Sequence, residues 1–86
     1  MDVNEVEAAV RELMSAMERD REYAIQRSPV YRRDFDNAIG AVQTALDHIK
    51  KGRTDSLKTL WTKNVALRAV ARNYDDEFAR VSAALR

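Results

Sequence analysis

Cysteine is absent from this sequence of 86 residues, and turn-forming residues are scarce, with two glycines and one proline. Without cysteine the chain has no disulfide framework, no thiolate metal site and no cysteine nucleophile. An all-β fold needs a tight turn after each short strand, so the lack of glycine and proline disfavours it. The composition therefore indicates a helical protein.

A large charge of one sign is also missing, because 15 Lys+Arg residues are balanced by 14 Asp+Glu residues. This net charge of +1 does not match a dedicated nucleic-acid binder or an acidic disordered tail. The longest charge-free stretch, residues 37–46, is far shorter than the roughly 20 residues of a membrane-spanning helix. Residues 1–5 do not have the apolar core of a signal peptide. We expect a cytoplasmic protein without a membrane segment, and the absence of cysteine is compatible with a reducing compartment.

Hydrophobic residues recur at helical spacing in two segments that are separated by Ser28 and Pro29. Ser28 is expected to cap the second helix, and Pro29 suits its first position because a proline has no N–H group to leave unpaired. Lys51 and Gly52 form a typical helix end after it. The first stripe consists of Val3, Val6, Val10, Leu13 and Met17, and the second of Phe35, Ile39, Val42, Leu46 and Ile49.

A third stripe begins after residue 53 and keeps its phase up to the end of the chain. Its members are Leu57, Leu60, Asn64, Leu67, Ala71, Tyr74, Phe78, Val81 and Leu85. The unbroken phase predicts one long C-terminal helix, and a break near Asn73 that gives four helices is the alternative. Short loops favour antiparallel neighbours. The predicted fold is therefore an all-α antiparallel three-helix bundle, with residues 1–86 as a single domain.

The predicted helices differ in length, and this difference leads to a prediction of function. At 1.5 Å per residue the first two helices are about 36 Å long, whereas the third would be about 45 Å. Its end would project from the bundle with large apolar side chains in water, which favours their burial against another chain. The predicted protein-binding residues are Trp61, Tyr74, Phe78, Val81 and Leu85. We expect a non-catalytic protein–protein interaction module (an assembly, adaptor or inhibitor protein) that binds a partner or itself as a homo-oligomer.

Two polar residues, Asp20 and Asn64, interrupt the apolar stripes. Both are expected to lie at a solvated edge of the bundle, and Asn64 has a second interpretation. A single buried asparagine can fix the register or the oligomeric state of coiled-coil-like helices, at a cost in stability. Asn64 is therefore a candidate register residue.

His48, the only histidine, lies in the sequence Asp47-His48-Ile49-Lys50-Lys51-Gly52. The spacing of His48, Lys51 and Gly52 resembles the His-x-x-Lys-Gly core of histidine-phosphotransfer domains, which are also helical bundles. The resemblance covers only these few residues. It implies that His48 is an exposed phosphoacceptor, that the lysine balances the phosphoryl charge and that the small glycine admits a response regulator. The alternative is a surface histidine beside a helix end.

A basic cluster surrounds the junction between the second and third predicted helices. It consists of Lys50, Lys51, Arg53 and Lys58, with hydroxyl side chains nearby, and it is a candidate anion-binding site. Nucleic-acid binding is accordingly a second alternative function, although the modest charge does not favour it. No motif indicates a catalytic residue, a metal site or a cofactor. The sequence therefore predicts that the protein is not an enzyme.

Overall fold

The computed structural model is all-helical in the part of the chain that it describes, which is residues 1–27 and 29–86 for the backbone and residues 1–22 and 32–86 for the side chains. The predicted helical fold class is confirmed. The elements are α1 (Val3–Arg27), α2 (Pro29–Lys50), α3 (Thr54–Lys63), α4 (Val65–Val70), the short 3-10 helix η1 (Ala71–Asn73) and α5 (Asp75–Ala84).

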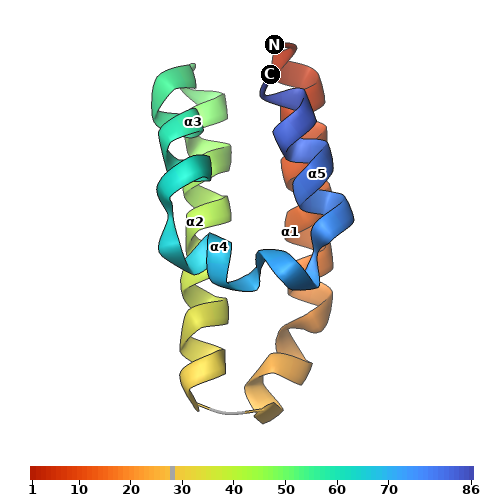
Figure 1. Ribbon diagram of the computed structural model, residues 1–86. Helices are drawn as coiled ribbons and strands as arrows, with labels where there is room; N and C mark the ends of the chain where they lie inside the picture. The colour runs from red at the N-terminus through yellow and green to blue at the C-terminus, as the bar shows by residue number, and fades with distance from the viewer. Residues whose placement is uncertain (28) are drawn as a thin grey trace.

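The helices form a bundle (Figure 1). α1, α2, α3 and α5 lie side by side at the end that holds the termini, and only α1 and α2 continue to the opposite end. α1 and α2 make a long antiparallel hairpin, α3 and α4 pack on α2, and α5 packs on α1. α4 and η1 cross from the α2 side to the α1 side near the middle of the hairpin, which extends beyond them as two helices. Both chain termini therefore lie at the same end of the molecule, which measures 37 × 19 × 18 Å.

The ends of the first two helices agree with the sequence signals. The Asp2 carboxylate accepts a hydrogen bond from the backbone N–H of Asn4 at 2.9 Å, as expected of an N-terminal cap. α1 ends at Arg27 and α2 begins at Pro29, as predicted. The predicted capping role of Ser28 lies outside the described residues.

The turn after α2 is a Schellman motif, which the sequence signal at Gly52 predicted. The N–H of Arg53 donates to the carbonyl of His48 at 2.8 Å, and the N–H of Gly52 donates to that of Ile49 at 3.2 Å. Gly52 has φ of +70°, a left-handed conformation that L side chains adopt only with strain. This turn sends α3 back along α2.

The prediction of one long C-terminal helix is wrong, and the first break is at Asn64. This residue is extended (φ −70°, ψ 118°), and its side-chain oxygen accepts a hydrogen bond of 3.0 Å from the N–H of Leu67. In a continuous helix its amide would lie on the apolar seam, where an unpaired polar group is costly. Here α3 ends and the amide caps α4, a role that asparagine favours.

The second break is at Tyr74, next to the position that the alternative prediction named. η1 ends at Asn73, Tyr74 has φ of −137°, and α5 then runs back along α1. Three acidic residues, Asp75, Asp76 and Glu77, occupy the first turn of α5, where the helix dipole favours negative charge. The chain thus folds the expected overhang onto its own first helix, and a single core contains side chains from α1, α2, α3, α4 and α5.

Candidate functional site

The apolar residues predicted to bind a partner lie in the core or against it. Tyr74, Val81 and Leu85 are buried, and Phe78 and Trp61 are half-buried against the same core. The premise of the predicted interface, an apolar helix end that no part of the chain covers, is therefore wrong. The break at Tyr74 is the physical reason, because it lets α5 bury these side chains against α1.

Trp61 joins α3 to α5 and is not a free anchor for a partner. Its ring lies 4.7 Å from that of Phe78 between centroids, and its indole N–H donates to the Ser82 hydroxyl at 3.1 Å. A buried tryptophan normally needs such a partner for its N–H group. These two contacts connect α3, which packs on α2, to α5, which packs on α1.

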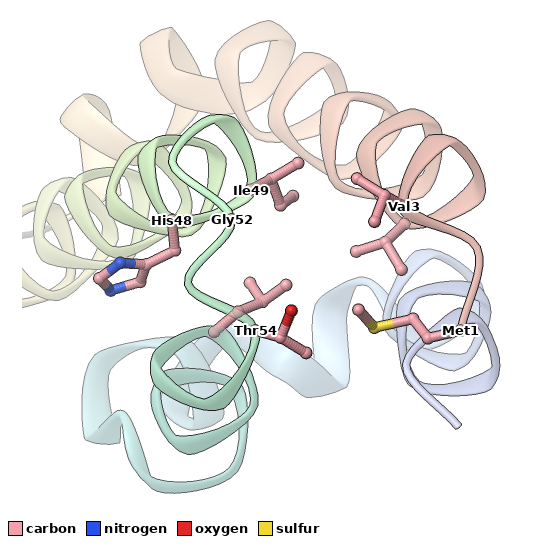
Figure 2. A pocket seen from close by; sticks show the side chains of 8 residues that line it. Met1, Val3, His48, Ile49, Gly52 and Thr54 are labelled. Atoms are coloured by element: carbon pink, nitrogen blue, oxygen red, sulfur yellow. The ribbon is translucent and has the colours of Figure 1, made fainter.

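An apolar cleft opens at the end of the bundle where the termini meet (Figure 2). Met1, Val3 and Ile49 point toward it, together with Thr54 from the start of α3. The volume is about 20 Å³, which is close to the space that one water molecule occupies. The cleft is too small and too apolar to be the binding site of a metabolite.

His48 contributes to the wall of this cleft, but its imidazole points away from the opening (Figure 2). The ring is partly exposed, and its Nδ1 atom is buried without a hydrogen-bond partner in the described part of the protein. Gly52 ends α2 through its positive φ, whereas the phosphotransfer motif places its glycine inside a continuing helix. The arrangement therefore gives no support to a phosphoacceptor at His48, which stays a prediction.

The column formed by α3 and α4 carries a basic face, by which we mean a group of exposed cations that is spread around the two helices, because residues five apart differ by about 140° around a helix. We define it by Arg53, Lys58, Lys63 and Arg68, which are all exposed. None of these four cations has a carboxylate within 4.0 Å among the side chains that the structure describes. Arg68 donates instead to the carbonyl of Thr62 at 2.9 Å. Of the predicted anion-binding residues, the face includes Arg53 and Lys58, whereas Lys51 pairs with Asp47 at 3.2 Å and Lys50 is exposed at the end of α2.

One large exposed apolar residue lies between two of these cations in the sequence. Val65, at the start of α4, is 81% exposed, more than Met1 or Val3 at the other end of the molecule. The basic face therefore combines positive charge with an apolar contact point.

On the side of α1 and α5 two arginines are paired with carboxylates. Glu7 pairs with Arg11 at 3.1 Å, and Glu12 pairs with Arg80 across α1 and α5. The hydrogen bond from Arg80 to Glu12, assisted by the charge of that carboxylate, raises the pKa of the arginine.

Three residues of the basic face and its surroundings were missed by the sequence reasoning, namely Lys63, Val65 and Arg68. The signal was present in the charge count. Residues 53–73 carry five basic residues against Asp55 alone, whereas residues 74–86 carry two basic and three acidic residues. A division of the chain at Tyr74 would have separated these opposite charges.

The described residues contain no group of three or more His, Asp or Glu side chains that could hold a metal ion. Within the same part of the chain, no helix has the length and apolar character needed to cross a membrane. Comparison of the sequence with protein-family models and curated proteins, and of the fold with solved structures, found no significant match.

Proposed function

We propose that this chain is a non-catalytic interaction module that docks on an acidic protein surface through its basic face. The observation that carries the proposal is that no described carboxylate lies within 4.0 Å of Arg53, Lys58, Lys63 or Arg68. Other exposed cations without such a partner (Arg33, Lys50, Arg72 and Arg86) are distributed over α2, η1 and the end of the chain, whereas α3 and α4 carry four in succession. We also propose a cytoplasmic location, where the reducing environment disfavours structural disulfides and a chain without cysteine loses nothing.

A protein partner accounts for more of this surface than a nucleic acid does. Val65, between Lys63 and Arg68 in the sequence, exposes an apolar side chain, and the net charge of the whole chain is only +1. A nucleic-acid binder gains most of its affinity from the release of counterions by many cations along a phosphate backbone. Four cations on one short column, on a nearly neutral molecule, suit a limited acidic patch with an apolar centre.

The test compares two probes by fluorescence anisotropy at low salt: a labelled poly-glutamate peptide and a labelled DNA duplex. We expect the peptide to bind and its affinity to fall as salt screens the charges. The variant Lys58→Glu with Lys63→Glu should weaken peptide binding at least tenfold. Lys50→Glu with Lys51→Glu is the matched control, because it changes the net charge equally but lies outside the basic face.

Three results would overturn the proposal. One is the absence of peptide binding at low salt. Another is binding of the duplex alone, with the same dependence on Lys58 and Lys63, which would make the protein a nucleic-acid-binding accessory factor. The third is an equal loss in the two lysine variants, which would show that only net charge matters and would remove the basic face as a specific site.

A further inference from the structure

A groove lies between α3 and α5, beside the only tryptophan of the chain. α5 runs back toward the end of the bundle at which α3 begins, so the groove brings together side chains that are distant in the sequence (Figure 1). Its volume of about 310 Å³ lies at the lower end of the range of small-molecule sites, roughly 300–1,000 Å³. The lining residues are Lys58, Trp61, Thr62, Ser82, Leu85 and Arg86.

This lining contains two cations and no carboxylate. Lys58 and Arg86 are exposed, and no described carboxylate lies within 4.0 Å of either side chain. Two larger grooves among the described residues differ in this respect. The groove between α1 and α5 includes Glu5 and Glu12, and the groove between α1 and α2 also includes two acidic residues. An anion would be repelled by those carboxylates, whereas the groove beside Trp61 attracts it.

The Ser82 hydroxyl adds a hydrogen-bond donor to the two cations. Its oxygen accepts the bond of 3.1 Å from the Trp61 indole N–H, and its own proton is donated to no group in the part of the chain that the structure describes. A hydroxyl can accept and donate at the same time, so this proton is available to an anion in the groove. The Thr62 hydroxyl, in contrast, already donates to the Lys58 carbonyl at 2.8 Å.

The same groove has a flat apolar wall. The indole of Trp61 is half-buried, and Leu85 is 8% exposed, so both present part of their surface to the groove. An aromatic ring prefers to lie against another ring or an aliphatic side chain. The lining therefore combines a charged side, which suits a carboxylate, with an apolar side, which suits a ring.

We propose that this groove binds an organic anion in which a carboxylate group is attached to a flat ring. Lys58 and Arg86 neutralise the carboxylate, to which the guanidinium can donate two parallel hydrogen bonds, and Ser82 donates a further one. The ring lies against Trp61 and Leu85. The site shares only Lys58 with the basic face, so this inference goes beyond the proposed function and does not depend on it.

The affinity is modest, because both cations are exposed and an exposed ion pair contributes little. For a ligand of about ten non-hydrogen atoms we expect a dissociation constant on the order of 1 mM at low salt. Salt screens the charges and should weaken binding.

The test is a titration with phenylacetate, followed by proton–nitrogen NMR. The single tryptophan gives one indole N–H signal, which reports on the Trp61 side chain directly. We expect this signal to shift and to saturate at millimolar phenylacetate. Acetate and inorganic phosphate lack the ring, and benzyl alcohol lacks the charge, so each should bind about tenfold more weakly or less.

A second probe distinguishes two sources of the same ligand chemistry. A tripeptide that ends in phenylalanine with a free carboxyl group presents a ring and a carboxylate as the end of a protein does. Tighter binding of the tripeptide than of phenylacetate would identify the end of a protein chain as the ligand. Tighter binding of phenylacetate would identify a free aromatic acid, and either result supports the proposed chemistry.

Single substitutions locate the site. Lys58→Gln and Arg86→Gln should each raise the dissociation constant for phenylacetate about threefold or more, because each removes one cation from the groove. Lys63→Gln is the matched control, since it removes one positive charge of the basic face from a residue that does not line the groove, and it should leave the affinity unchanged. Far-UV circular dichroism shows whether each variant keeps its helices.

The inference is overturned if phenylacetate causes no saturable shift at low salt, if acetate or benzyl alcohol binds equally well, or if Lys63→Gln weakens binding as much as Arg86→Gln. Its failure is distinguishable from failure of the proposed function. Poly-glutamate binding should require Lys58 and Lys63 but not Arg86, whereas phenylacetate binding should require Lys58 and Arg86 but not Lys63.

Discussion

The Tyr74 hydroxyl donates a hydrogen bond of 2.9 Å to the Asp20 carboxylate, which lies 54 positions earlier in the sequence. This contact joins the start of α5 to the C-terminal half of α1, at the point where the chain turns back on itself. We expect Tyr74→Phe to lower the free energy of unfolding by about 1 kcal/mol, because the acceptor is charged but nearly half exposed. Urea denaturation followed by circular dichroism measures the loss.

A double-mutant cycle with Asp20→Ala provides the control for this contact. If the hydrogen bond contributes as expected, the variant Tyr74→Phe with Asp20→Ala loses less stability than the two single losses added together. Strictly additive losses would show that the two side chains are energetically independent.

Substitution of Val81 tests whether α5 belongs to the protein's own core or to an interface with another chain. Its side chain has no exposed surface, so Val81→Ala should lower the stability by about 2 kcal/mol through lost burial and a small cavity. Val65→Ala is the matched control, because the same atoms are removed from a side chain that is 81% exposed, and its effect should be small. A change of mass by light scattering without a loss of stability in Val81→Ala would return this residue to an intermolecular interface.

The hydrophobic periodicity predicted which residues of the C-terminal segment are buried but not the path of the backbone. Each of the nine residues in the third stripe is buried or half-buried, although the helix that they were assigned to is broken twice. Hydrophobic periodicity identifies which side of a segment packs against apolar surface. The pattern is the same whether that surface belongs to another chain or to α1. The boundary between the first two helices and the end of the second have clear signals at Pro29 and Gly52, and the structure agrees with both.

The candidate site was harder to predict, because it depends on contacts between distant residues. The sequence placed Lys58 and Arg53 in a basic cluster with Lys50 and Lys51, but it does not show that Asp47 neutralises Lys51. The role of Lys63 and Arg68 depends on the break at Asn64 and on the fold of α5 away from them. Only the tertiary structure separates paired from unpaired charges.

Asn64 has two proposed roles that predict opposite outcomes. If Asn64 acts as the cap of α4, its replacement by alanine should lower the free energy of unfolding by about 1 kcal/mol. Asn64→Asp keeps the accepting oxygen and should be close to neutral. As a register residue on a coiled-coil-like seam, its replacement by leucine should raise the melting temperature and change the oligomeric state. Thermal unfolding and light scattering of Asn64→Ala, Asn64→Asp and Asn64→Leu separate the two roles.

The two glycines of the chain should respond oppositely to replacement by alanine. Gly52 has φ of +70°, so Gly52→Ala forces a side chain into the left-handed region and should cost about 1 kcal/mol even though the space around it is open. Gly40 lies inside α2 with no atom within 4 Å of the position of a Cβ atom. Gly40→Ala should therefore stabilise the protein by about 0.5–1 kcal/mol. Equal effects in chemical denaturation would contradict the assignment of Gly52 as the helix terminator.

Trp61 is the only tryptophan, so its fluorescence reports directly on the contact between α3 and α5. Ser82→Ala removes the acceptor of the indole N–H and should lower the stability by about 1 kcal/mol, since a half-buried donor is left without its partner. Trp61→Phe keeps an aromatic ring against Phe78 and removes the donor, so the further change Ser82→Ala should then have little effect. Circular dichroism follows all four proteins, and fluorescence follows the two that retain Trp61. An undiminished loss for Ser82→Ala in the Trp61→Phe background would show that Ser82 stabilises α5 without the indole, and that the two columns are held together by ring packing alone.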